Sequence, residues 1–123
     1  MNEMETYEEG DLKIQIDRSD FLLRMIWLGK CTLKEPSKFL DPIINELYVE
    51  SQKSAKKLLF DFTNFTFMNS SAIIPIIKTL KTIREGRGVV HVHYNKEEKW
   101  QRTLIGELRV FQTDDSRIQI KGV

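Results

Sequence analysis

Cysteine, charge of one sign and long apolar runs are all scarce in this sequence, and each scarcity excludes a class of protein. Cys31 is the only cysteine, so no internal disulfide can form and a reducing compartment is expected. The apolar run from Phe21 to Leu28 is interrupted by Arg24 and is far shorter than the ~18 residues of a membrane-spanning helix. The first ten residues hold four glutamates and no basic residue, which does not resemble a secretory signal. We therefore expect a cytoplasmic protein without membrane insertion.

Basic and acidic residues nearly balance, so the chain as a whole has no strong attraction to polyanions. The 19 lysines and arginines against 18 aspartates and glutamates give a formal net charge of +1. Basic clusters at 53–57 and 78–87 do not alternate with aromatic residues as a base-stacking groove would. The six glycines are scattered and form no phosphate-cradling motif. We expect no nucleic-acid partner and no cofactor.

The length of 123 residues predicts one domain with its own hydrophobic core. We expect residues 11–123 to form this domain. The sequence leaves open whether the acidic segment 1–10 folds onto it or stays flexible, as charged termini often do. A lone thiol such as Cys31 is most often buried in such a core.

Hydrophobic periodicity predicts the order β-β-α-β-α-β-α-β. The expected strands are 12–17, 21–28, 58–62, 89–94 and 117–121, and the expected helices are 41–53, 73–83 and 100–111. Asp41 and Pro42 suit an N-cap and a first helical residue, with 36–40 as a lead-in turn, and Gly29 should close the second strand. Strands that alternate with helices imply an α/β fold with a mainly parallel sheet, to which the opening hairpin adds an antiparallel edge.

Three residues that favour helix caps, Asn69, Ser70 and Ser71, stand where a buried strand gives way to a helix. Helix starts leave N–H groups unpaired and carry partial positive charge, so they favour hydroxyl or amide caps and also anions. Pro75 lacks an N–H and its ring crowds the carbonyl of Ser71, so we expect an irregular first turn. Two interpretations stay open: a helix cap alone, or a site that a phosphate or a partner reaches.

The helix that follows places an isoleucine on its polar side. At 100° per residue, Ile74 lies with Lys78 and Lys81, away from the apolar stripe that begins at Ile73. A single exposed isoleucine is common, but one turn after Ser70 it also suits a contact with a partner. Ile74, Lys78 and Lys81 are therefore the expected partner-binding residues.

One stretch resembles the signature of STAS domains, the sulfate-transporter and anti-sigma-factor antagonist fold: KKLLFDFTNFTFMNSSAIIPIIKTLK, residues 56–81. In that family an apolar strand, an Asp, a short loop and a Met-Asp-Ser-Ser/Thr-Gly junction lead into an amphipathic helix. The resemblance extends over most of the chain and includes GVVHVHYNKEEKWQRTLIGELRVF, residues 88–111, which is similar to the family's next strand and helix. Asn69, Ala72 and Pro75 depart from the pattern, since the family usually has Asp, Gly and a small apolar residue there.

The resemblance implies a bacterial regulatory protein, without enzymatic activity, that acts in signalling and transcription regulation. Ser70 matches the serine that a partner kinase phosphorylates in the family, and Asp61 matches the acidic or amide residue that ends the core strand. The unphosphorylated form of such an anti-anti-sigma factor binds an anti-sigma factor that is also a serine kinase of the histidine-kinase ATPase fold. Phosphorylation releases this partner, and a metal-dependent Ser/Thr phosphatase resets the switch.

The departures at the junction favour an alternative function. An amide at Asn69 can cap but supplies no charge, and the methyl group of Ala72 disfavours a positive φ. The alternative is a scaffold subunit that is not phosphorylated and docks on a transporter ATPase or a signalling complex. In either case we expect Asn69 and Ser71 to cap the helix and bond locally.

Catalysis and metal binding have little support in the sequence. His91 and His93 point to the same face of an expected strand, but no third ligand stands nearby at metal-ligand spacing. They are also the only histidines that could serve Ser70 as a base, and both lie in the middle of a later strand. We therefore expect neither an enzyme nor a metal site.

Overall fold

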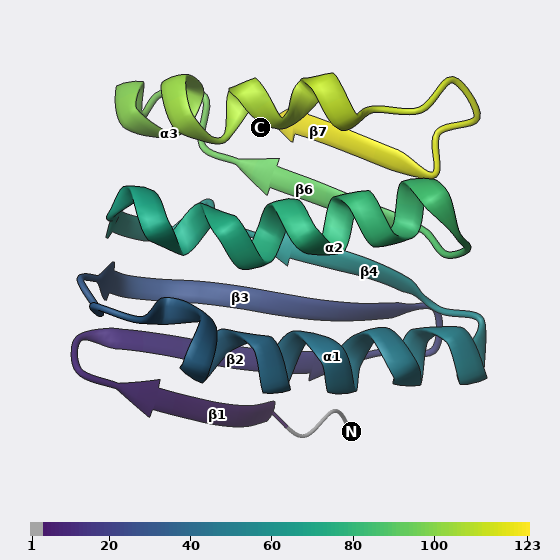
Figure 1. Cartoon of the computed structure of the whole chain (residues 1–123), viewed down its shortest axis with the longest axis horizontal. Helices are drawn as coiled ribbons and strands as arrows, with labels where there is room; N and C mark the ends of the chain where they lie inside the picture. Colours follow the sequence, from purple (N-terminus) through teal and green to yellow (C-terminus); the bar gives the residue numbers. More distant parts are fainter. Residues whose placement is uncertain (1–3) are drawn as a thin grey trace.

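The computed structural model describes residues 4–123 as two layers, a seven-stranded sheet and the helices that lie across one of its faces (Figure 1). The strands are β1 (Met4–Glu9), β2 (Leu12–Arg18), β3 (Leu22–Cys31), β4 (Lys57–Asp61), β5 (Phe65–Met68), β6 (Val90–Tyr94) and β7 (Ile118–Gly122). The helices are α1 (Pro36–Ser54), α2 (Ile73–Glu85) and α3 (Lys99–Leu104), with the 3-10 turns η1 (Ser70–Ala72) and η2 (Gly106–Phe111). No helix within the described residues is long and apolar enough to cross a membrane.

Strand pairing divides the sheet into an antiparallel part and a parallel part. Across the sheet the order is β1-β2-β3-β4-β6-β7. The β1–β2 and β2–β3 pairs are antiparallel, whereas β3, β4, β6 and β7 run parallel. The short β5 pairs in parallel with the end of β3. The α/β fold with a mainly parallel sheet and an antiparallel hairpin is therefore confirmed, but the predicted order of elements was wrong in omitting β1 and β5.

The hydrophobic core lies between the sheet and the helices, because alternate residues of each strand point toward the helical layer. Trp27 of β3, Phe60 of β4 and Leu80 of α2 are all fully buried there. The ring centroids of Trp27 and Phe62 lie 4.8 Å apart. Cys31 is buried in the same core, and this burial raises the pKa of its thiol.

Helix α1 begins earlier than the sequence predicted. Pro36 occupies the start of the helix, where a missing N–H has no partner within the helix anyway. Pro42, which was expected to open the helix, lies inside it on the exposed side. Leu40 is fully buried, and it reaches the core only because the turn before Pro42 is helical. Packing of this turn therefore outweighs the hydrogen bond that Pro42 removes.

Strand β3 does not end at Gly29, as the sequence predicted, but continues to Cys31. Gly29 has a φ of +77°, and the pairing register with β5 shifts between Gly29 and Lys30. A β-carbon at this position would lie 2.1 Å from the carbonyl oxygen of Asp11. Gly29 therefore makes an irregularity within the strand that allows its last residues to pair with β5.

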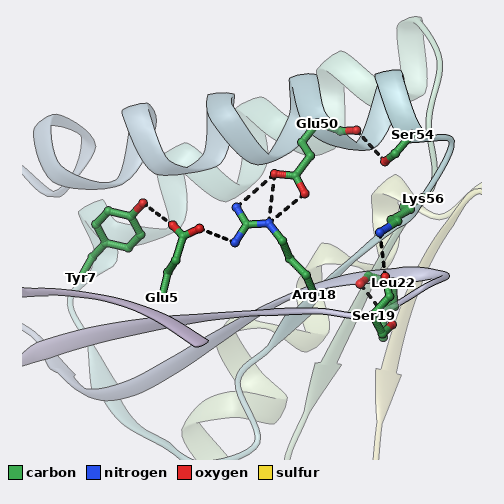
Figure 2. A network of polar contacts seen from close by, with 8 residues as sticks. All are labelled: Glu5, Tyr7, Arg18, Ser19, Leu22, Glu50, Ser54 and Lys56. Carbon is green, nitrogen blue, oxygen red and sulfur yellow. Dashed lines mark hydrogen bonds and ion pairs between the residues drawn. The ribbon is translucent and has the colours of Figure 1, made fainter. Parts of the chain in front are cut away.

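Strand β1 covers most of the acidic segment whose folding the sequence left open, while residues 1–3 lie outside the described part. Arg18 of β2 joins β1 to α1, as Figure 2 shows. Its guanidinium donates to Glu5 of β1 and, at 2.9 to 3.1 Å, to both carboxylate oxygens of Glu50 in α1. The Tyr7 hydroxyl donates to Glu5 at 2.8 Å. The N-terminal strand is thus bonded to both layers.

A tight turn after β4 leads the chain into β5, which pairs with the next part of β3. Oδ1 of Asp61 accepts hydrogen bonds from the N–H and the hydroxyl of Thr63, at 2.9 and 2.6 Å. The buried Gln101 of α3 donates to the carbonyls of Phe62 and Phe65, at 2.7 and 3.0 Å. These bonds satisfy the polar backbone of the turn and hold it against α3.

The helix predicted over 100–111 is broken in two. Helix α3 ends at Leu104, and the 3-10 turn η2 starts at Gly106, a residue that weakens a regular helix. The predicted apolar stripe is still used for packing, because Leu108 is buried and Trp100 and Leu104 lie partly against the core.

Replacing Gly29 tests the irregularity in β3. We expect Gly29→Ala to lower the free energy of unfolding by more than about 2 kcal/mol, since its methyl group meets Asp11 and its φ is left-handed. Gly10→Ala is the matched control, because Gly10 also has a positive φ of +59°, but a β-carbon there would lie 3.6 Å from its nearest atom, Cδ2 of Leu33. Its free energy of unfolding, measured in urea, should fall by only about 1 kcal/mol. Equal losses in the two variants would contradict the clash.

Candidate functional site

The junction between β5 and α2 lies at the carboxyl ends of the parallel strands, on the left in Figure 1. Binding sites of parallel sheets favour the loops beyond these carboxyl ends. Asn69 follows β5 directly, and Ser70 is the next residue and opens η1. The sequence predicted that the junction lies at the carboxyl end of a parallel strand, and the structure places it there.

Asn69 ties the junction to the loop between β3 and α1. Its backbone N–H donates to the carbonyl of Cys31 at 3.0 Å, and its Nδ2 donates to the carbonyl of Leu33 at 2.9 Å. Its Oδ1 accepts from the N–H of Ala72 and from the hydroxyl of Ser71, each at 3.2 Å. Asn69 is therefore the N-cap of η1, and both atoms of its amide are in use.

The two serines differ in exposure and in bonding. Ser71 is half-buried, and its hydroxyl donates to Asn69. Ser70 is exposed, and no hydrogen bond holds its hydroxyl within residues 4–123. The Ser70 hydroxyl is therefore accessible from solvent, and no local hydrogen bond has to break to expose it.

The first turn after the strand is irregular, as the position of Pro75 predicted. A 3-10 turn precedes α2, and Pro75 is buried at the third position of that helix, where an N–H has no helical acceptor. Ala72 has a φ of −70° and a ψ of −17°. Its backbone does not use the positive φ that a glycine would permit, so the methyl group of Ala72 causes no strain here.

The expected partner-binding residues lie on the outer side of α2. Ile74 is 47% exposed, and Lys78 and Lys81 are exposed as well. The Lys78 ammonium lies 3.6 Å from the carboxylate of Asp41 in α1, so it borders the groove between the two helices. Ile74 and Ser70 share the exposed start of the helix, and the lysines follow farther along it.

An apolar groove beside the junction was not predicted from the sequence. The residues that line it are Phe67, Met68, Lys99, Trp100, Thr103 and Leu104. Phe67 is 45% exposed, and its ring centroid lies 6.5 Å from that of Trp100. Residues two apart in a strand share a face, so alternation alone would have grouped Phe67 with the buried Phe65, and no local signal marks Phe67 as outward-facing. Exposed aromatic side chains of this kind often anchor protein interfaces.

Asp61, which the STAS resemblance matches to the residue that ends the core strand, is the last residue of β4 and lies outside the junction surface. Its carboxylate lies on the sheet face away from the helices and accepts from Nη2 and Nε of Arg24, at 2.5 and 3.0 Å. Burial raises the pKa of the Asp61 carboxyl, but the hydrogen bonds from Thr63 and Arg24 outweigh it and hold that pKa below its ordinary value. Asp61 is therefore a charged structural residue.

His91 and His93 lie on the same face of β6, as the alternation predicted. Burial lowers the pKa of both imidazoles, so both are mainly neutral at pH 7. Nε2 of His91 lies 3.3 Å from the carbonyl of Ser116. Among the described residues, no group of three or more His, Cys, Asp or Glu could hold a metal ion.

No protein-family model and no curated protein matches this sequence. Among solved structures, the chain is similar to one from the crystal structure of the diguanylate cyclase SiaD in complex with its activator SiaC from Pseudomonas aeruginosa. The TM-score is 0.62 with 18% sequence identity, over 94% of this chain and 98% of that chain. At this identity the similarity shows a shared fold over nearly the whole of both chains.

Replacing Asn69 tests its role as the link of the junction. We expect Asn69→Ala to lower the free energy of unfolding by about 1–2 kcal/mol and to speed amide exchange at Ala72, because the cap is lost. Asn69→Asp keeps the acceptor but loses the bond to Leu33, so its loss should be smaller. Asn64→Ala, at an exposed position, is the control. Amide exchange that is as fast in the control as in Asn69→Ala would contradict the cap.

The pH dependence of stability tests the charge of Asp61. Because its folded pKa lies below the unfolded value of about 3.9, its stabilisation is present above that value and is lost as the pH falls through the folded pKa. We expect Asp61→Asn to cost on the order of 1–2 kcal/mol at pH 7, and this difference should shrink below about pH 4. Asp20→Asn, at an exposed turn position, is the control. A difference from wild type that does not change with pH would contradict the ion pair.

Proposed function

We propose that this protein is a regulatory module of the anti-sigma-factor antagonist type. It would bind a partner protein at the carboxyl ends of the parallel strands and be switched by phosphorylation of Ser70. The observation that carries the proposal is the position of Ser70. Its hydroxyl is exposed at the start of η1, three residues after Phe67 of the apolar groove and four before Ile74. A single phosphate there would lie beside the surface that a partner covers.

The apolar groove and Ile74 supply the affinity of the proposed interface. Phe67 and Trp100 offer aromatic area that a partner can bury, and Ile74 adds an aliphatic contact on the other side of Ser70. Lys78 and Lys81 form the polar rim along α2. Burial of the groove strengthens binding only while the hydroxyl between these contacts is uncharged.

Phosphorylation would act through charge and desolvation. A phosphoserine carries a charge of about −1.5 to −2 at pH 7, and it would have to lose water wherever a partner covers the groove. Phe67 and Ile74 offer that charge no counter-ion, so the closed interface is penalised. The phosphorylated form is then the free form, in the direction that the STAS resemblance implies.

Two classes of partner are consistent with this proposal. The STAS resemblance points to an anti-sigma factor with the histidine-kinase ATPase fold, with a metal-dependent phosphatase to restore Ser70. The similar solved structure contains a diguanylate cyclase in complex with its activator, which points to a signalling enzyme as the partner. In both cases the proposed partner is a signalling protein that this module would bind.

Phosphorylation by a candidate kinase tests the switch. We expect a serine kinase encoded beside this protein to transfer phosphate from ATP to Ser70 in wild-type protein, with the site mapped by mass spectrometry. Ser70→Ala should remove the label, while Ser71→Ala, whose hydroxyl is half-buried and bonded to Asn69, should keep it. Equal labelling of Ser70→Ala and wild type would exclude Ser70 as the phosphoacceptor.

The second candidate function is a scaffold that docks on a transporter ATPase or a signalling complex without phosphorylation. It is favoured by Asn69, which has an amide in place of the family's carboxylate and is fully occupied by local bonds. Binding of the partner to two variants separates the functions. Ser70→Asp should weaken binding at least about tenfold for a switch and leave it unchanged for a scaffold, whereas Trp100→Ala should weaken it for both.

A further inference from the structure

The face of the sheet opposite the helices is not covered by any element of the described chain, and Figure 1 shows α1, α2 and α3 together on the other side. The side chains on this face come from alternate positions of β1, β2, β3, β4, β6 and β7. They are Met4, Thr6, Glu8, Lys13, Gln15, Asp17, Leu22, Arg24, Ile26, Leu28, Lys57, Leu59, Asp61, His91, His93, Gln119 and Lys121. Most of them are half-buried or exposed.

An uncovered face is unusual for this part of the sheet. Antiparallel sheets often have one wet face, but parallel strands are nearly always covered on both sides. Here β3, β4, β6 and β7 form a four-strand parallel region with one face open. Ile26 and Leu59 lie at its centre and are only 8% exposed, because the longer polar side chains around them cover them. The face thus has an apolar centre with a polar border.

The polar border is basic on the side of β4 and β7, where Lys57 and Lys121 lie, whereas Asp17 of β2 lies on the other side of this face. Asp61 is neutralised by Arg24, and Lys13 lies 3.6 Å from Glu8 of β1. Lys57 and Lys121 are exposed, and neither forms an ion pair within residues 4–123. The register aligns Ile26, Asp61, His93 and Lys121 in one row across the strands.

The charges on this face act on a common centre. Burial lowers the pKa of His93, and the positive charges of Lys121, Arg24 and Lys57 lower it further, against the opposite effect of Asp61. Three cationic side chains from three different strands therefore lie close enough to His93 to influence it. An anionic group placed over β6 would interact with all of them.

We propose that this basic sheet face binds an acidic, amphipathic segment of a partner protein. Carboxylates of the segment would pair with Lys57 and Lys121, and its apolar residues would cover Ile26 and Leu59. A second copy of this chain fits poorly, because face-to-face contact would bring these lysines together. Nucleic acid fits less well, since the face carries no Phe, Tyr or Trp on which bases could stack.

Binding of defined probes tests this surface. The main probe is a fluorescein-labelled peptide of about 15 residues, roughly the length at which an isolated helix becomes marginally stable, with Glu on one side and Leu on the other. The comparison probes are the same peptide with Lys in place of Glu, and a single-stranded DNA oligonucleotide of equal charge. Fluorescence anisotropy should show binding of the acidic peptide, weaker at high salt, and none of the basic peptide.

Charge reversal locates the binding. The double variant Lys57→Glu, Lys121→Glu should weaken binding of the acidic peptide at least tenfold. The control double variant Lys53→Glu, Lys96→Glu changes the net charge equally at exposed positions off this face and should leave this binding unchanged. Thermal melting checks that both variants stay folded. In wild-type protein, amide shifts on adding the peptide should concentrate in β4, β6 and β7.

Several results would overturn the proposal. They are no binding of the acidic peptide, equal weakening by both double variants, and amide shifts confined to the helices or the apolar groove. Tighter binding of the oligonucleotide with the same dependence on Lys57 and Lys121 would assign the face to nucleic acid instead. The Ser70→Asp variant should bind the acidic peptide like wild type, so this proposal and the phosphorylation switch fail separately.

Discussion

Strand β3 pairs in parallel with both β4 and β5, and this constraint positions the candidate site. One side of the strand pairs with β4 over Leu22–Ile26 and then with β5 over Gly29–Cys31. The turn at residues 62–64 separates the two pairings along β3, and Gln101 holds that turn through the carbonyls of Phe62 and Phe65. The segment after β5 then leaves the sheet at the carboxyl ends of the strands, where Ser70 is exposed.

Placement of all the helices on one side gives the molecule two surfaces of different chemistry. At the carboxyl ends of the strands, Phe67 and Trp100 form an apolar groove near the exposed Ser70 hydroxyl, so the proposed phosphate would lie beside the proposed contact. On the open sheet face, Lys57 and Lys121 border a small apolar centre, and the attraction proposed there would depend on salt. The two surfaces share no residue, so the two proposed contacts would form separately.

The three junction residues that differ from the STAS pattern, Asn69, Ala72 and Pro75, fit the local backbone of this chain. Ala72 adopts an ordinary right-handed conformation, and Pro75 lies within the first helical turn, where it removes no hydrogen bond. Asn69 replaces a charge with an amide that bonds in two directions, to the loop before α1 and to η1. The junction of this chain is therefore capped without a carboxylate at position 69 and without a glycine at position 72.

The sequence alone determined the features that depend on neighbours along the chain. Apolar residues that recur every 2 or every 3.6 positions located most strands and helices, and Pro75 predicted the irregular turn before α2. The start of α1 was wrong, because burial of Leu40 overrides the local signal of Asp41 and Pro42. Strand β5 and its outward Phe67 were missed, since a four-residue strand exists only because the end of β3 is available to pair with it. The uncovered sheet face was likewise decided by tertiary structure, because no local pattern states on which side of a sheet three helices will pack.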